Sequence, residues 1–196
     1  MTGMADRPAR RDVADLEALK ALAQPRRQRI LQHLNLHGPA TSATLARALG
    51  LNTGATSYHL RELARHGFVA EMPERAQGKQ RWWRYVRADI RFPPRGEQDA
   101  ATRAVMDELA SASFAQDLRT FAAARERADA EPDGWADAFP FSHGTIRVTE
   151  RGLAEFFEEY IALLNRYREP PPEDEAGGAG EARTIVTRFF AFPAPR

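Results

Sequence analysis

Small polar side chains gather at the start of the segment from Thr53 to Arg61, and a phenol and a guanidinium follow them. If this segment is helical, Thr56, Leu60 and Leu63 lie on one face because they are four and three residues apart. The opposite face then carries Thr53, Gly54, Ser57, Tyr58 and Arg61. A helix in the major groove of DNA needs short donors and acceptors near base edges and longer groups near phosphates. The segment therefore predicts a DNA contact, with an ordinary solvent-facing surface as the alternative.

Three further side chains close to this face have two interpretations each, and Gly54 on the face itself needs an explanation. His59 is either an interior histidine or a phosphate contact. Thr41 and Ser42 can donate to a phosphate at a helix N-terminus, and they would look the same if they only capped that helix. Gly54 costs a helix about 1 kcal/mol relative to alanine, and a close approach of the backbone to DNA would explain its presence. We keep all four as candidate DNA-binding residues.

A second polar and basic segment follows, with side chains at Arg75, Gln77, Lys79, Gln80, Arg81 and Arg84. At the tip of a hairpin, such residues follow DNA phosphates or enter the minor groove. Gln77, Lys79 and Arg81 are the candidate DNA contacts here. A solvated hairpin tip has a similar composition, so both interpretations stay open.

Four helices must position these side chains, and local signals predict each of them. Leu16, Leu19 and Leu22 recur at helical spacing. Pro25 suits the first turn of a second helix, where its missing N–H costs nothing, and Gly38 follows its end. The third helix begins at a cap formed by Thr41 or Ser42 and ends at Gly50. The fourth helix begins at a cap formed by Asn52 or Thr53 and runs to His66, with Gly67 after it.

The periodicity then changes from helical to alternating, which predicts strands over 68–74 and 80–87 joined by a turn at 76–79. Trp83 should point inward, whereas Trp82 should face the other side and pack on the C-terminal region. Helices joined by a three-residue turn and followed by a hairpin predict a winged helix-turn-helix domain over residues 14–95. Residues 1–13 are polar and aperiodic, and we expect a flexible tail.

A break at Phe92–Gly96 separates this domain from a C-terminal region over residues 96–196. In order, the sequence predicts a helix over 97–128, a loop over 131–144, a strand over 145–148, a helix over 149–168 capped by Thr149, a mobile loop over 169–182 and a strand over 184–192. Leu153, Phe157, Tyr160 and Leu164 form an apolar seam on the later helix. The fold class is therefore mainly α with a β-hairpin wing, plus a helical C-terminal region for dimerisation with a short sheet.

The stretch from Ala23 to Val69 resembles the ArsR-type winged helix-turn-helix transcription regulators. The matching residues are Pro25-x-Arg27-x-x-Ile30-Leu31-x-x-Leu34, Leu45-Ala46-x-x-Leu49-Gly50-Leu51, Thr56-Ser57-Tyr58-His59-Leu60-x-x-Leu63, Gly67-Phe68-Val69 and the hairpin from Gly78 to Tyr85. The resemblance covers about a third of the chain and implies the fold and DNA binding. Trp135, the stretch from Thr149 to Tyr167 and the Phe-rich end are similar to tails that some of these regulators carry.

Charge is divided unevenly along the chain. Residues 1–95 hold 17 basic and 8 acidic side chains, whereas residues 96–196 hold 11 and 19. A basic half is typical of a protein that faces a polyanion. The sequence has no cysteine, which excludes disulfides and thiolate metal sites. It also has no apolar run of the roughly 18 residues that a membrane span needs, and no apolar stretch typical of a secretory signal. We expect a cytoplasmic protein.

Metal sensing, a trait of the resembled family, has no matching residues here. Its familiar sites use cysteines or acid and histidine pairs on the helix after the wing, and residues 97–130 contain no histidine. His33 and His37 are four residues apart but straddle the end of an early helix. We therefore expect no metal and no cofactor. Twelve of the 18 aromatic residues follow residue 95, and they either line a pocket for a small apolar effector or form core and dimer interface.

These observations predict a homodimeric, sequence-specific regulator of transcription, with repression favoured over activation. Double-stranded DNA and a second copy are the expected partners, because one winged helix contacts only half of a palindromic operator. The helices over 97–128 and 149–168 would form the dimer. The alternative is a winged helix used for protein–protein contact in a larger assembly. No nucleophile elbow, phosphate-binding glycine loop or metal-ligand spacing points to an enzyme.

Overall fold

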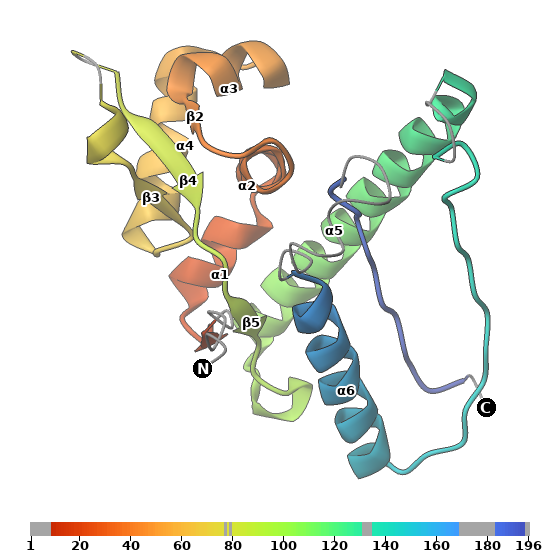
Figure 1. Cartoon of the computed structure of the whole chain (residues 1–196). Coiled ribbons are helices and arrows are strands. Elements are labelled where there is room, and N and C mark those ends of the chain that lie inside the picture. The colour runs from red at the N-terminus through yellow and green to blue at the C-terminus, as the bar shows by residue number, and fades with distance from the viewer. Residues whose placement is uncertain (1–8, 77, 79, 131–134, 169–182, 195–196) are drawn as a thin grey trace, which may run out of the picture. The chain divides into compact units, whose positions relative to one another are not determined.

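The computed structural model describes residues 9–76, 78, 80–130, 135–168 and 183–194. These residues form two compact units that divide between His143 and Gly144. The elements of both units are labelled in Figure 1. The first unit groups the long helix that follows the wing with the winged helix, whereas the sequence places a boundary between residues 95 and 96. The predicted mobile loop over 169–182 and most of the predicted tail lie outside the described residues.

The first unit begins with the four predicted helices. They are α1 (Leu16–Ala23), α2 (Pro25–His37), α3 (Ser42–Leu49) and α4 (Thr53–Arg65). The side chains of Asp15, Gln24, Thr41 and Asn52 accept hydrogen bonds from backbone N–H groups in the first turns of these helices, in that order. A side-chain oxygen at this position satisfies a donor that the helix leaves unpaired. Gly67 follows α4 with a φ of 67°, as the sequence predicts for the residue that ends the helix.

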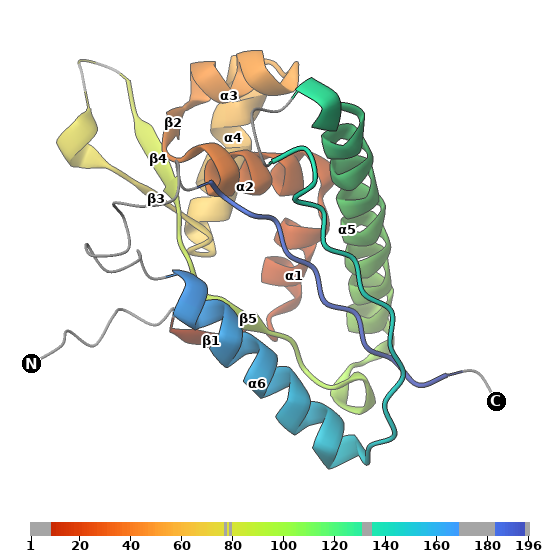
Figure 2. The ribbon, with the colours of Figure 1, turned by 45° about the vertical axis from the view of Figure 1, so that its right-hand side comes forward.

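A small antiparallel sheet lies beside these helices, with the strand order β2-β4-β3. The strands are β2 (Ala40–Thr41), β3 (Val69–Glu71) and β4 (Trp82–Tyr85). β3 and β4 form the predicted wing, which extends away from α3 and α4 (Figure 2). Both strands are shorter than predicted. β3 ends before Pro73, which cannot donate to a ladder and starts a 3₁₀ turn over Pro73–Arg75. β2 was not predicted.

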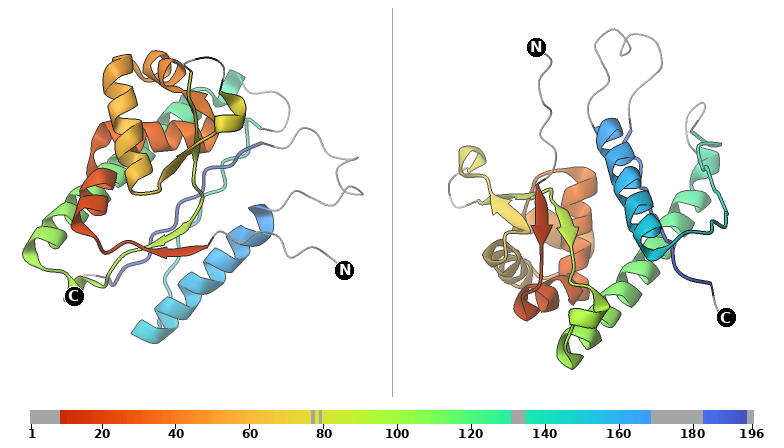
Figure 3. Two further views of the ribbon diagram at one scale, coloured as in Figure 1. Left: turned by 90° about the vertical axis from the view of Figure 1, so that its left-hand side faces the viewer. Right: turned by 90° about the horizontal axis from the view of Figure 1, so that it is seen from below.

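A second, parallel strand pair corrects the prediction for the N-terminal tail. β1 (Arg10–Asp12) pairs with β5 (Asp89–Arg91), and the two run side by side in both views of Figure 3. Val13 N–H donates to the Arg91 carbonyl at 2.8 Å, and Asp89 N–H donates to the Ala9 carbonyl at 3.1 Å. The prediction of a flexible tail is therefore wrong for residues 10–12, because their partners lie almost 80 positions later in the chain.

The core of this unit lies between the helices and the sheet. Its members include Leu19, Leu22, Ile30, Leu34, Leu45, Leu60, Leu63, Phe68 and Trp83. The long helix α5 (Ala100–Glu126) packs along α1 and adds Leu109 to this core. α5 begins after Asp99, whose carboxylate accepts from Thr102 N–H at 2.7 Å. It therefore starts three residues later than predicted, since Arg95–Glu97 form a 3₁₀ turn. A further 3₁₀ turn, Ala128–Ala130, follows α5.

The second unit consists of α6 (Glu150–Arg168) and an extended C-terminal segment. Thr149 caps α6 as predicted, because its Oγ1 accepts from Gly152 N–H at 3.1 Å. The predicted strands over 145–148 and 184–192 are wrong: the backbone of both segments is non-helical but joins no ladder. A β-prone sequence becomes a strand only where another strand pairs with it. The fold class, mainly helical with a winged helix-turn-helix, is confirmed.

Candidate nucleic-acid interface

α4 divides into a buried and an exposed face where the spacing predicts. Thr56, Leu60 and Leu63 have no exposed surface. Thr53, Gly54 and Arg61 are exposed, Ser57 is half-buried, and Tyr58 is 52% exposed. The Arg61 Nε donates to the Ser57 carbonyl at 3.2 Å. The predicted division of the helix is confirmed, so its polar face is open to a ligand.

Gly54 has a local explanation besides DNA approach. The Asn52 Oδ1 accepts from Gly54 N–H at 2.8 Å and from Ala55 N–H at 3.3 Å. A Cβ at position 54 would lie only 3.1 Å from that oxygen. Glycine therefore leaves room for the cap that starts α4.

The N-terminus of α3 brings Thr41 and Ser42 to the same side as α4. Thr41 is buried, and its Oγ1 accepts from Thr44 N–H at 3.1 Å and bonds the Thr44 hydroxyl at 3.0 Å. Thr41 therefore caps α3, one of the two roles left open by the sequence. Ser42 is the first residue of the helix and is half-buried.

A recess of about 360 Å³ lies between α3, α4 and β4. It is lined by Thr41, Ser42, Ala43, Thr53, Ser57, Arg61, Gln80, Arg81 and Trp83. Six of these residues were named from the sequence as candidate contacts. Arg61 and Arg81 are the charged members of this described lining, and both are basic. The recess therefore combines hydroxyl and amide groups with positive charge, which suits a nucleic-acid backbone and base edges.

The wing supplies further basic groups beside the recess. Arg81, which lines the recess, directly precedes β4, and its Nη1 lies 3.5 Å from the Oε2 of Glu71 on β3, so this pair bridges the two sides of the wing. The Arg75 guanidinium lies 5.8 Å from the Trp82 ring centroid, and Arg84 is exposed. Trp83 is only 4% exposed and points inward as predicted. Gln77 and Lys79, two of the candidate contacts, lie outside the described residues.

His59 belongs to the core side of α4, with 7% of its surface exposed. Of its two interpretations, this burial favours the interior histidine. Burial lowers the pKa of His59, and the positive charges of Arg27 and Arg26 lower it further. The imidazole is therefore neutral near pH 7 and adds no positive charge to the interface.

Two arginines that bond the carboxyl ends of α3 and α4 were not predicted from the sequence. Arg29 Nη2 donates to the Leu49 carbonyl at the end of α3, at 2.7 Å. Arg11 reaches the end of α4 and bonds the carbonyls of His66 and Gly67. Their partners are 20 and 56 positions away, so no local pattern could reveal them.

Two apolar surfaces lie outside this interface, one in each unit. In the first unit, Phe114, Leu118 and Phe121 form a stripe on α5 and are 55, 61 and 50% exposed. In the second unit, a cavity of about 460 Å³ is lined by Glu150, Leu153, Ala154, Phe157 and residues 189–192. The Phe189 ring stacks on Tyr160 with centroids 4.6 Å apart. The predicted seam of α6 thus contributes Leu153 and Phe157 to an aromatic pocket.

His33 and His37 have ring centroids 4.6 Å apart on α2. Within the described ranges, no three histidine or acidic side chains lie close enough together to hold a metal ion. No described helix has both the length and the apolar character to cross a membrane.

Comparison with known proteins gives one family match, a helix-turn-helix domain over residues 22–71. No curated protein matches the chain. Reduced HlyU from Vibrio cholerae N16961 is 24% identical to this chain. The match covers 46% of this chain and 80% of HlyU, with a TM-score of 0.32. A homodimeric winged helix-turn-helix DNA-binding domain from Mycobacterium bovis, described as a possible ArsR-family regulator, is 26% identical over 52% of this chain and 76% of its own, with a TM-score of 0.32. The helix-turn-helix assignment rests on the family match and on the elements described above, not on these low TM-scores.

Proposed function

We propose that this chain is a homodimeric, sequence-specific DNA-binding regulator of transcription of the ArsR type, acting in the cytoplasm and more as a repressor than an activator. The recess between α3, α4 and β4 carries this proposal, because hydroxyl groups from two helices meet Arg61 and Arg81 there. In the proposed complex, α4 enters the major groove of a palindromic operator. The wing lies on the flanking backbone, with Gln77, Lys79 and Arg81 near phosphates.

Selection of bound fragments from genomic DNA tests this function directly. The purified chain should enrich a small set of fragments that share a palindromic motif. It should protect that motif in footprints, with half-sites about one helical turn apart. Enrichment of no sequence at any salt concentration would contradict the proposal. That result would favour the alternative, a winged helix used for protein–protein contact.

The apolar stripe on α5 supports a dimer. Phe114, Leu118 and Phe121 are large, exposed and spaced by four and three residues, and large apolar groups on one helix face mark contact surfaces. We propose that the stripe packs against the same stripe of a second copy, with the α6 seam as a further contribution. No enzymatic activity is part of this proposal.

The cavity on α6 is our proposed site for a small apolar effector. Its volume of about 460 Å³ falls in the range of small-molecule sites, and its aromatic lining suits an apolar ligand. A screen of apolar aromatic compounds should find ligands that quench or shift the fluorescence of the wild-type chain. Phe189→Ala should remove that response, because it removes the ring that stacks on Tyr160. An unchanged response in Phe189→Ala would place the ligand elsewhere.

A further inference from the structure

The guanidinium of an arginine on the N-terminal strand β1 contacts the carboxyl end of α4. Arg11 Nη1 donates to the Gly67 carbonyl at 2.8 Å, and Arg11 Nη2 donates to the His66 carbonyl. The Arg11 Cζ lies 4.5 Å from the ring centroid of Phe68. The last carbonyls of a helix lack intrahelical partners and carry partial negative charge. A planar guanidinium bonds the carbonyl of His66, which caps α4, and the carbonyl of Gly67 just after it, while it stacks on an aromatic ring. The point charge of an ammonium lacks this planar fork.

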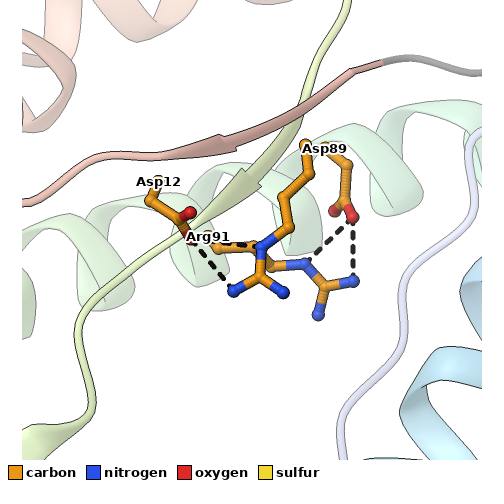
Figure 4. A network of polar contacts seen from close by, with 4 residues as sticks. Asp12, Asp89 and Arg91 are labelled. Atoms are coloured by element: carbon orange, nitrogen blue, oxygen red, sulfur yellow. Dashed lines mark hydrogen bonds and ion pairs between the residues drawn. The ribbon is translucent and has the colours of Figure 1, made fainter.

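The same strand is bonded to the segment that leaves the wing. Arg11 pairs with Ile90, and Asp12 pairs with Arg91, in the parallel ladder between β1 and β5. Asp89 and Arg91 add an ion pair of 2.8 Å beside this ladder, with Asp12 on the neighbouring strand (Figure 4). β5 follows β4 after a short link, so the position of β1 is tied to the wing.

Asp15 makes a second contact with the end of α4. Its Oδ2 caps α1 by accepting from Ala18 N–H at 2.9 Å and lies 3.9 Å from the Nδ1 of His66. We call residues Arg10–Asp15 the N-terminal strap. The strap therefore touches the end of α4 at two points and the base of the wing through backbone hydrogen bonds.

We infer that Arg11 is a positioning residue for DNA recognition: through the N-terminal strap it fixes α4 relative to the wing. This inference rests on the proposed function. α4 has 13 residues, which makes it about 20 Å long. A tilt of about five degrees at its anchored end moves the other end by more than 1 Å, enough to break hydrogen bonds to base edges. Arg11 contacts the C-terminal end of α4, whereas Thr53 and Ser57 lie in its N-terminal half. Arg11 thus acts on these two side chains through the helix and does not itself meet DNA.

Arg11→Ala and Arg11→Lys test this role, with Arg10→Ala as the matched control. Arg10 lies on the same strand and carries the same charge, but its guanidinium bonds only the exposed Asp12 among the described contacts. Arg11→Ala should weaken binding to the selected operator about tenfold, the loss expected when a tilt of α4 breaks one good contact to a base edge. Arg11→Lys should give an intermediate loss because it keeps the charge and loses the fork. Arg10→Ala should bind as the wild type does.

Binding to random DNA separates positioning from contact. A positioning role predicts that Arg11→Ala keeps its affinity for random DNA and its salt dependence, and loses only the preference for the operator. An equal loss on every sequence, with the slope of log K against log salt reduced by about one, would make Arg11 a phosphate contact and overturn the inference. Unchanged operator preference in folded Arg11→Ala, well below its melting temperature, would also overturn it.

Hydrogen exchange gives a readout that does not depend on DNA. The amide of Phe68, just beyond α4, donates to the carbonyl of Leu63 within the helix. This amide should exchange faster in Arg11→Ala and Arg11→Lys than in Arg10→Ala. Equal exchange in all three variants would show that Arg11 does not hold the helix end, whatever the DNA experiments give. If the wild type selects no DNA while the exchange differs as expected, the proposed function fails and the anchoring of α4 stands.

Discussion

Thr53 and Ser57 have the side chains on α4 that are best suited to contact base edges, because each carries a hydroxyl group. Both line the recess beside the wing. Thr53→Ala and Ser57→Ala should each relax base preference at one operator position, by about 1–3 kcal/mol for a good contact. Competition binding with operators changed at single positions measures this effect. Ser111→Ala is the control, because Ser111 is exposed on α5. Unchanged preference in both variants would remove these residues from the interface.

His59 should make the stability of the chain depend on pH. Burial, with the charges of Arg27 and Arg26, lowers its pKa below the usual value of 6.5. The unfolded chain then binds a proton that the folded chain does not, so the free energy of unfolding falls as pH falls below about 6.5. The loss is complete once the pH is below the folded pKa. His33 adds a loss in the same direction, because burial and then His37 lower its pKa.

Urea unfolding at pH 7.5 and pH 5.5 measures this loss of stability. His59→Gln should lose less stability between the two values than the wild type, because Gln cannot take up the proton. His143→Gln, which changes an exposed residue, should lose as much as the wild type. If His59→Gln and the wild type lose equal amounts, His59 does not contribute to the pH dependence.

Single residues were predictable where local spacing decides their surroundings. The burial of Thr56, Leu60 and Leu63 follows from a repeat of four and three on one helix. The position of Arg11 could not be predicted, because its partners are 55 and 56 positions away and nothing near Arg11 in the chain points to them. Cap residues such as Thr41 stay ambiguous in sequence, since a capping hydroxyl and a phosphate-binding hydroxyl are the same group.

At the scale of elements, helices were easier to predict than strands. A helix is stabilised by bonds within four residues and by its caps, so Thr149 and Asn52 mark α6 and α4 correctly. A strand needs a partner that local sequence does not identify. This explains both kinds of error: the local sequence predicts a tail where β1 forms, and it predicts a strand over residues 184–192, which join no ladder.

The wing is the element whose charge should set the salt dependence of binding. Arg81→Ala and Lys79→Ala should weaken binding to all sequences alike and should each lower the slope of log K against log salt by about one. Arg81 also pairs with Glu71 at 3.5 Å, so Glu71→Gln should strengthen binding slightly by freeing that charge. Arg119→Ala, on the exposed side of α5, is the control. A loss confined to particular base pairs, with the slope unchanged, would instead make these residues contacts to bases.

At the scale of the whole molecule, charge and apolar surface are separated along the chain. The first 95 residues carry a net charge of +9 and the remainder a net charge of −8. The basic part contains the recess, while exposed aromatic residues gather on α5 and on the second unit. DNA contact and self-association are therefore expected to use different surfaces, so each can be disturbed separately.

Divalent metals should leave operator binding unchanged. The sequence has no cysteine, and the described part of α5 carries no histidine that could form the late-helix site of the resembled family. Operator affinity should therefore be the same with micromolar zinc and with a chelator. Release of the wild type from DNA by zinc would reveal a site made of oxygen and histidine ligands. His33→Gln would then test whether the pair on α2 contributes.

The proposed dimer should depend on the apolar stripe of α5. Leu118 is 61% exposed between Phe114 and Phe121, so a charge there should leave the folded unit intact while it disrupts contact with a second copy. Burial of such side chains contributes about 1.5–3 kcal/mol each, enough for three of them in each copy to hold a stable dimer. Light scattering should show Leu118→Glu as a monomer with weak operator binding, although α4 is unchanged. Ala104→Glu adds the same charge at an exposed position earlier on α5 and should stay dimeric.

Leu164→Glu tests the α6 seam in the same way: if it is monomeric and Leu118→Glu is dimeric, the second unit and not α5 forms the interface.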